Sequence, residues 1–286
     1  MEAGDTIRID AGVYRDCAVW RAPRLTIEGV GGVAHIRDVS CEGKGLWVFC
    51  NGPVKIRNVR FSGAQVPRRN GAGIRWEGRG WLVVENTRFD GNQMGILTHN
   101  RRISRLFVSN SRFEGNGACE KFCGHAIYAG YIGELRVQGS TFRNHAFGHH
   151  IKSRALVSTI VGNRISDGPT GTASYAINLP NSGTADIRHN VIQKGRLTDN
   201  IHCAVCIGEE IRPRGPEYRA SSAANPSRGI TVTQNTFRND SGSPETALVW
   251  NRGPHPVRLQ ANTMTGPGVK YFAGPKPDEK PKSAGH

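Results

Sequence analysis

The sequence lacks any long hydrophobic run. Its richest apolar stretch, Leu46–Cys50, is five residues long, whereas a membrane-spanning helix needs about 18 apolar residues. A membrane-embedded protein is therefore excluded. The chain also has few of the residues that favour helices, and its 36 glycines and 19 asparagines interrupt it throughout, so an all-α fold is disfavoured. Since 37 % of the 286 residues are apolar and 21 % are charged, we expect a folded protein with a buried core.

Acidic residues are scarce: 23 Asp and Glu stand against 38 Lys and Arg, which leaves a net charge of +15. Of the basic residues 29 are Arg and 9 are Lys, and the planar guanidinium suits recognition of carboxylate, phosphate or sulfate. No zinc-finger spacing, basic helix or RNA-binding aromatic motif concentrates this charge, so nucleic acid is not the expected partner. The expected partner is an acidic polysaccharide. The alternative is that the positive charge only reflects the amino-acid composition of the host's proteins.

Seven cysteines leave at least one thiol unpaired within the chain. Cys119 and Cys123 are close enough to bridge in a loop. Cys203 and Cys206 lie in an expected strand, where three residues at about 3.3 Å each exceed the reach of a disulfide, so we expect this pair to be reduced. The polar start of the chain carries no secretory signal. We expect the natural N-terminus to have been removed and the protein to be periplasmic or secreted.

One phrase recurs eight times: apolar-x-apolar, two or three residues that often include Asn, then a further apolar residue. The second apolar positions of the copies are Ile56, Val84, Val108, Val137, Ile160, Ile187, Val232 and Leu259. The separations average near 26 residues apart from one interval of 45, and the last apolar residue always falls five after this position. Each copy continues through a Gly-rich loop to a second strand, centred on Ile74, Ile96, Ile127, Ile151, Ile177, Val205 or Ile207, and Val249.

Asparagines occupy the corner between the apolar positions of each copy. They stand two residues after the anchor at Asn58, Asn86 and Asn110. Later copies have them three residues after it, at Asn163, Asn190, Asn235 and Asn262. Asn tolerates left-handed backbone geometry, and its amide can hydrogen-bond along a stack. A unit this short must stack on its neighbours to bury its apolar face, which predicts an all-β, right-handed parallel β-helix solenoid of roughly nine coils.

The opening GDTIRIDAGVYRD, residues 4 to 16, together with the repeats, resembles the pectate-lyase-like superfamily, which includes uronate lyases and epimerases. The resemblance covers nearly the whole chain and is specific for the fold, but weak for activity, because the scaffold also serves hydrolases, adhesins and tailspikes. We expect one β-helix domain over residues 1–273 with a long loop at 208–228. Residues 274–286, rich in Pro and Lys, are expected to be a disordered tail.

Strict alternation along the strand around Ile151 predicts which side chains face solvent. With Ile151 inward, His150, Lys152 and Arg154 form an outward row, whereas His149 and Ser153 point inward. The outward column through Lys152 is expected to contain Arg75, Leu97, Tyr128, Lys152 and Asn178. His125, His149 and Tyr175 are expected to stack on the inward face as a polar ladder that fixes the strand of Lys152, and His99 to border an open floor beside the basic row.

These residue types meet the demands of β-elimination on a uronic acid polymer, which needs a base, a group that neutralises the carboxylate, and an acid. Several uronate lyases on this scaffold, which the sequence resembles, use a Lys base with a nearby Arg. The resemblance implies Lys152 as base, Arg154 as neutraliser, and Tyr128 or His150 as acid. Candidate substrate-binding residues are His125, His149, Asn178, Tyr175, Arg75, His99, and Arg212, Arg214 and Tyr218 of the long loop.

No cofactor and no metal are expected. A calcium site needs several convergent carboxylates, but the coils around Lys152 offer only Glu134 and Asp167. The paired carboxylates of an inverting hydrolase are not found either. A four-thiolate zinc site fails because the two cysteine pairs lie about three coils, or ~14 Å, apart. We expect a monomeric, metal-independent polysaccharide lyase; the alternatives are a non-catalytic binding or structural solenoid, and a C5-epimerase or glycoside hydrolase using the same groove.

Overall fold

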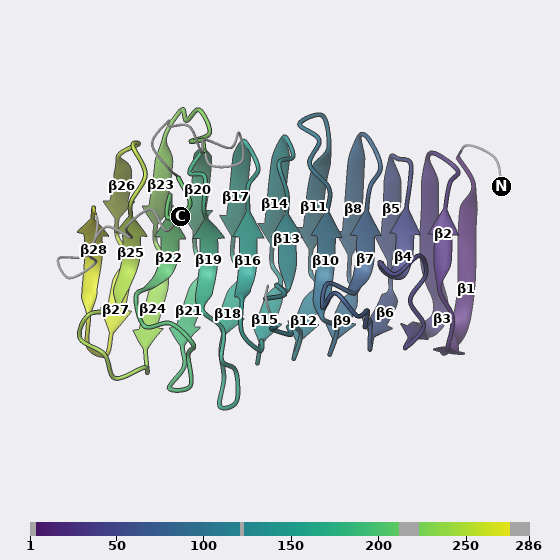
Figure 1. The fold of residues 1–286 in the computed structure, drawn as a ribbon, viewed down its shortest axis with the longest axis horizontal. Coiled ribbons are helices and arrows are strands. Elements are labelled where there is room, and N and C mark those ends of the chain that lie inside the picture. The colour runs from purple at the N-terminus through teal and green to yellow at the C-terminus, as the bar shows by residue number, and fades with distance from the viewer. Residues whose placement is uncertain (1–3, 121–122, 212–222, 275–286) are drawn as a thin grey trace, which may run out of the picture.

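The computed structural model describes residues 4–120, 123–211 and 223–274, and in these residues every named element is a β-strand. The strands form the coils of a parallel β-helix of about nine turns, stacked from β1 at one end to β28 at the other (Figure 1). All the pairings between strands are parallel, so the predicted fold class is confirmed. No helix in this part of the chain is long and apolar enough to span a membrane.

Each complete coil contributes one strand to each of three walls. We call these walls A, B and C. Walls A and B belong to one sheet, and its first two strands, β1 (Thr6–Tyr14) and β3 (Leu25–Arg37), are long enough to run through both walls. Wall A continues with β5 (Val54–Arg57), β8 (Trp81–Glu85), β11 (Arg105–Ser109), β14 (Glu134–Gln138), β17 (Val157–Val161), β20 (Thr184–Arg188), β23 (Ile230–Thr233) and β26 (Val257–Gln260). Wall B continues with β6 (Val59–Ser62), β9 (Arg88–Asp90), β12 (Arg112–Glu114), β15 (Thr141–Arg143), β18 (Arg164–Ser166), β21 (Val191–Lys194), β24 (Thr236–Asn239) and β27 (Thr263–Thr265).

Wall C is a separate sheet of ten strands and carries the groove described below. Its strands are β2 (Ala18–Trp20), β4 (Gly45–Phe49), β7 (Ala72–Trp76), β10 (Met94–Thr98), β13 (Ile127–Ala129), β16 (His149–Ser153), β19 (Tyr175–Leu179), β22 (Cys203–Ile207), β25 (Ala247–Asn251) and β28 (Val269–Ala273). The predicted loop at 208–228 leaves the helix after β22, although residues 212–222 are outside the described part. The expected disordered tail is outside it as well, apart from Gly274, and stays a prediction.

The core consists of apolar columns, one residue per coil. The repeat anchors from Ile56 to Leu259 pair with one another in the predicted order along wall A. The residue five positions later forms a second column on wall B, in which Phe89, Phe113 and Phe142 stack at centroid distances of 4.7 Å. The column from Ile74 to Val249 closes the core from wall C. The repeat therefore positions every coil by burying identical faces on each other.

The corner asparagines have two structural roles. Asn58, Asn86 and Asn110 adopt left-handed backbone geometry, with φ between 46° and 58°. Asn163, Asn190, Asn235 and Asn262 instead form a buried ladder. The amide oxygens of Asn190, Asn235 and Asn262 each accept hydrogen bonds from the backbone and side chain of the Asn in the preceding coil. The ladder satisfies backbone groups inside the turn that water cannot reach.

Replacing Asn190 by Ala is expected to destabilise the fold by about 2–4 kcal/mol, because it removes bonds to Asn163, Asn235 and the Ile160 carbonyl and leaves buried groups unsatisfied. Urea unfolding measures the change. Asn86→Gly is the matched control, since Asn86 is exposed and left-handed, and its loss should stay within about 0.5 kcal/mol. Equal losses in the two variants would contradict the role of the ladder.

Candidate functional site on wall C

A groove of about 830 Å³ lies on the outer face of wall C, over β7, β10, β13 and β16. Strands supply its floor, and the segment before β7 and the start of the long loop supply its sides. Its lining includes Arg68, Arg69, Asn70, Arg75, Leu97, His99, Asn100, His125, Tyr128, His149, Lys152, Arg154, Asp199 and Glu210.

The predicted column of outward residues exists. Arg75 pairs with Leu97, Leu97 with Tyr128, Tyr128 with Lys152, and Lys152 with Asn178 across adjacent strands. Arg75, Tyr128 and Lys152 line the groove. Asn178 is fully buried beside it, where its amide donates a hydrogen bond to Glu209.

The predicted orientation of two histidines is wrong. His149, expected inward, lines the groove, and its ring stacks between those of His125 and Tyr175, at 4.7 Å from each. His150, expected in the outward row, is 1 % exposed and packs with its ring 6.3 Å from that of Phe142. His150 therefore has no access to the groove. The three-residue stack of His125, His149 and Tyr175 exists, but on the outer face rather than inside.

The reason is a break in alternation that repeats along wall C. Two consecutive residues, His150 and Ile151, both point inward, and His150 has no register partner on β19. The same pairs on neighbouring strands are Ala126 and Ile127, Ala176 and Ile177, Ala204 and Val205, and Leu248 and Val249. His150 occupies a column that holds small residues, mainly Ala, in most other coils. The available signal in the sequence was a pair of adjacent small or apolar residues in the other strands of wall C. Strict alternation with period two does not account for such a pair.

The same break corrects the cysteine prediction. Cys203 and Cys206 both face outward, three residues apart, with Cα atoms separated by 5.8 Å, and they form a disulfide. That separation lies within the range that a disulfide spans. Cys17–Cys41 and Cys119–Cys123 are also bridged, and Cys50 is free.

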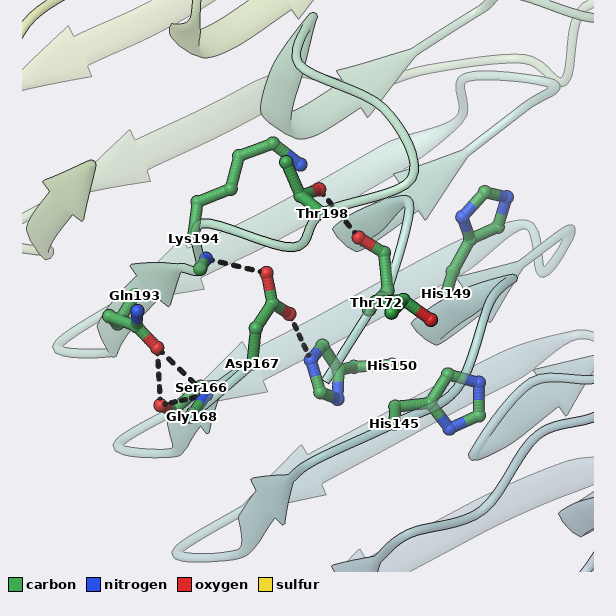
Figure 2. A network of polar contacts seen from close by, with 12 residues as sticks. His145, His149, His150, Ser166, Asp167, Gly168, Thr172, Gln193, Lys194 and Thr198 are labelled. Atoms are coloured by element: carbon green, nitrogen blue, oxygen red, sulfur yellow. Dashed lines mark hydrogen bonds and ion pairs between the residues drawn. The ribbon is translucent and has the colours of Figure 1, made fainter. Parts of the chain in front are cut away.

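Behind the groove, His150 belongs to a buried polar network (Figure 2). Its Nε2 lies 2.9 Å from Asp167 Oδ1, and Asp167 Oδ2 accepts a hydrogen bond from the backbone of Gly195. Lys194, which precedes Gly195 in the chain, is buried, and its ammonium donates a hydrogen bond to the carbonyl of Ser174 at 2.6 Å. Burial lowers the pKa of Lys194 to about 8. The network anchors the loops after β18 and β21 behind the strand that carries Lys152.

The imidazoles on the groove side are uncharged at neutral pH. Burial, assisted by the positive charge of Lys152, lowers the pKa of His125 and His149 well below the usual value. Burial also lowers the pKa of His99, which lines the groove, to about 4. Both ring nitrogens of His99 and the Nδ1 of His149 are buried without a hydrogen-bond partner in the described part of the chain. These nitrogens are covered by protein atoms and are not exposed to the groove.

Glu210 is the central feature that the sequence did not reveal. Its two carboxylate oxygens contact the two expected catalytic cations: Oε1 lies 2.6 Å from Lys152 Nζ, and Oε2 contacts Arg154 Nη2. Burial favours the protonated acid, but Lys152 and Arg154 outweigh it and hold the pKa of Glu210 below its usual value. One carboxylate is thus held by both cations. Glu210 lies 58 residues from Lys152 in sequence, on a loop without periodicity, so no pattern placed it there.

Arg154 is held by several groups at once. Its Nε donates to the Tyr128 hydroxyl at 2.9 Å, and its Nη1 donates to the Tyr131 hydroxyl at 3.1 Å and to Asn181 Oδ1 at 2.5 Å. Burial disfavours the guanidinium charge, but Tyr128 and Glu210 outweigh it and raise the pKa of Arg154 above its usual value. Arg154 is therefore a fixed cation aimed into the groove. Tyr131 and Asn181, which sequence reasoning did not identify, position it.

The remaining predicted residues divide into three groups. Arg75 lines the groove and pairs with Glu77 at 3.2 Å. Tyr175 borders the groove through its stack with His149, and its hydroxyl accepts a hydrogen bond from Asn200. Arg212, Arg214 and Tyr218 lie outside the described residues. Within the described ranges, no three His, Cys, Asp or Glu side chains come together as a metal-binding group.

Comparisons with solved structures find distant similarity of overall shape. A tailspike protein double mutant of E. coli bacteriophage HK620 has a TM-score of 0.45 at 12 % identity over 90 % of this chain, which spans 46 % of the tailspike chain. The mannuronan C-5 epimerase AlgE4 A-module of Azotobacter vinelandii has a TM-score of 0.39 at 14 % identity. The match covers 95 % of this chain and 90 % of the epimerase chain. A mannuronic acid-specific polysaccharide family 6 lyase from human gut microbiota has a TM-score of 0.38 at 13 % identity. The match covers 95 % of this chain and 78 % of the lyase chain.

No curated protein matches the sequence. Residues 44–269 match the family described as "Right handed beta helix region". This match spans more than half of the chain and agrees with the parallel coils, the apolar columns and the asparagine ladder of the structure. The chain therefore belongs to the right-handed β-helix family.

Proposed function

We propose that the protein is an extracytoplasmic enzyme that cleaves an acidic, uronic acid-containing polysaccharide by β-elimination. The observation that supports this best is that Lys152 and Arg154 together hold the carboxylate of Glu210 at the groove. A uronate carboxylate has the same charge and geometry, and would bind there once Glu210 moves aside. The three disulfides suit a compartment outside the cytoplasm.

In the proposed reaction, Arg154 neutralises the uronate carboxylate, which makes the neighbouring C5 proton more acidic. Lys152 then removes this proton. The uronate carboxylate takes the place of Glu210 at Arg154, and Lys152 acts as the base in its neutral amine form. The electron pair of the C–H bond forms the C4–C5 double bond as the bond to the leaving O4 oxygen breaks.

Tyr128 is the proposed acid for the leaving oxygen. Its hydroxyl accepts a hydrogen bond from Arg154 and is left free to donate its proton, and its ring lies 5.6 Å from Lys152 Nζ. The burial of His150 removes it from this role. His149 and His99 are neutral and line the groove, and their covered nitrogens would reach sugar hydroxyls only after a local rearrangement.

The direct test is incubation with a panel of uronic acid polymers, followed by the ultraviolet absorbance of the unsaturated product. A rise in absorbance supports elimination. A change in the stereochemistry of the polymer without a rise would assign an epimerase instead, because both reactions begin with removal of the C5 proton. Binding with neither change would assign a non-catalytic module. Activity in the presence of EDTA tests the expected independence from metal ions.

Glu210→Gln tests whether the carboxylate of Glu210 competes with substrate. We expect KM to fall by about 3- to 10-fold, because the free enzyme no longer has to release an internal carboxylate before it binds the polymer, with a smaller change in kcat. Glu134→Gln, which removes the same charge on wall A, should leave both constants unchanged. A rise in KM for Glu210→Gln would mean that Glu210 helps to bind substrate.

A further inference from the structure

A second groove, of about 980 Å³, lies on wall B, on a different side of the coil from Lys152. Its lining residues come from six successive strands, β12, β15, β18, β21, β24 and β27, which span about 24 Å at the spacing of paired strands. In Figure 1 the connections that follow β18 and β21 extend beyond wall B as long loops. Gly168 and Pro169 of the first loop and Arg196 of the second line this groove.

This arginine groove is strongly basic. It is lined by five arginines and one carboxylate, Asp240; the arginines are Arg112, Arg143, Arg164, Arg196 and Arg238. Arg112 pairs with Glu114, and Arg238 pairs with Asp240 at 2.8 Å. Arg143, Arg164 and Arg196 form no ion pair or hydrogen bond with the residues that the structure describes, although the charge of Arg143 acts on Glu114 in the preceding coil.

The missing carboxylates are specific to this part of the wall. Towards the N-terminus, the column next to the outward arginines contains Asp90 and Glu114, which pair with Arg88 and Arg112. The same column then continues as Arg143, Ser166 and Gln193. The acid that neutralises the outward arginine on β9 and β12 is therefore absent on β15 and β18. A groove lined mainly by one sign of charge concentrates the field and raises the local concentration of anions, which suits it to an external anion.

The arginines follow the axis of the solenoid. Arg112 and Arg164 occupy one column two coils apart, about 9.6 Å, with Thr141 between them. Arg143 and Arg238 occupy the neighbouring column three coils apart, about 14 Å. A linear polymer with an anionic group on every second unit can reach several of these guanidinium groups at once, which a small anion cannot do.

The floor of the groove favours a sugar chain over a nucleic acid. Ser166 donates to Gln193 at 2.6 Å, and Gln193 donates to Asp240 at 2.9 Å, so hydroxyl and amide groups are held in place between the arginines (Figure 2 shows Ser166 and Gln193). Phe142 is the one aromatic residue in the described lining, and it is fully buried. Single-stranded nucleic acids are bound by stacking on exposed aromatic rings, and none is offered here.

We propose that the arginine groove binds a polysaccharide chain that carries carboxylate or sulfate groups, independently of the groove around Lys152. The shared chemistry is a line of anionic groups along an extended glycan. This site would hold such a polymer on wall B whether or not wall C processes it, so the proposal does not rest on the elimination reaction.

The test measures fluorescence anisotropy with labelled heparin, which is sulfated, and labelled polygalacturonate, which is carboxylated, and uses a single-stranded oligonucleotide as competitor. All variants carry Lys152→Ala to prevent turnover. The test variant adds Arg143→Gln, Arg164→Gln and Arg196→Gln. The matched control adds Arg8→Gln, Arg136→Gln and Arg188→Gln, which remove the same charge from ion-paired arginines on wall A. Circular dichroism and thermal unfolding check that both variants fold.

We expect Kd for at least one glycan to rise about tenfold or more in the test variant, with a weaker dependence on salt, and to change much less in the control. The probe that binds identifies the anionic group. Equal Kd values in the two variants, or no binding of either glycan to the parent, would overturn the proposal. Tighter binding of the oligonucleotide, lost in the test variant, would assign the groove to nucleic acid. A lack of elimination activity in the wild type would bear only on the wall C site.

Discussion

Replacing Lys152 by Ala is expected to reduce the elimination rate by about 10²- to 10⁴-fold, the usual contribution of a positioned base. Lys152→Arg should be almost as inactive, because guanidinium keeps the positive charge but does not release its proton at working pH. The rate of formation of the unsaturated product measures both. The KM of Lys152→Arg should change less than its kcat, since the cation that faces the carboxylate is kept.

Lys55→Ala is the matched control for this experiment. Lys55 lies on wall A and pairs with Glu85 at 2.8 Å, away from the groove. Its replacement should leave the rate unchanged. If Lys152→Ala retains most of the activity while Tyr128→Phe loses it, the base is Tyr128 and Lys152 only binds the substrate.

The protein is expected to lose stability steeply on acidification below about pH 6.5. Burial lowers the pKa of His145 to about 3, that of His99 to about 4, and that of His125 and His149 well below the usual value. Between the two pKa values the unfolded chain binds protons that the folded chain does not, so stability is full above the unfolded pKa and falls as the pH drops. Four such imidazoles give a slope of up to about 5 kcal/mol per pH unit.

Urea unfolding at a series of pH values measures this slope. His145→Gln should reduce it by about one quarter, because it removes one of these four imidazoles with a lowered pKa. The Gln amide can still bond to the Gly124 carbonyl that His145 contacts. His189→Asn is the control, since His189 is exposed and left-handed, a geometry that Asn tolerates. A slope that His145→Gln leaves unchanged would mean that acid sensitivity comes from other groups.

Much of the fold was predictable from sequence because it depends on repetition. The anchor column from Ile56 to Leu259 and the column from Arg75 to Asn178 appear in the structure with the predicted partners. Each coil must bury the same face against the next, so a regular spacing of apolar residues determines which residues are neighbours. Lys152, Arg154 and Tyr128 were placed together by this register alone.

The orientation of His149 and His150 was not predictable by the same argument. Alternation with period two assumes a regular strand, and wall C contains two consecutive inward residues in most of its coils. One irregular residue exchanges the faces of everything on one side of it. It moved His149 into the groove and His150 behind it, and it brought Cys203 and Cys206 to the same face.

By itself, the sequence determined the parallel coils, the order of residues along each column and the cluster of Lys152 with Arg154 and Tyr128. These follow from local period and from the cost of exposing an apolar face. Only the tertiary structure decided that Glu210 contacts both cations and that Arg143, Arg164 and Arg196 share a groove in which none of them forms an ion pair with the described residues. Loops have no period, and the pairing of charges depends on where distant segments meet in space, which no spacing along the chain encodes.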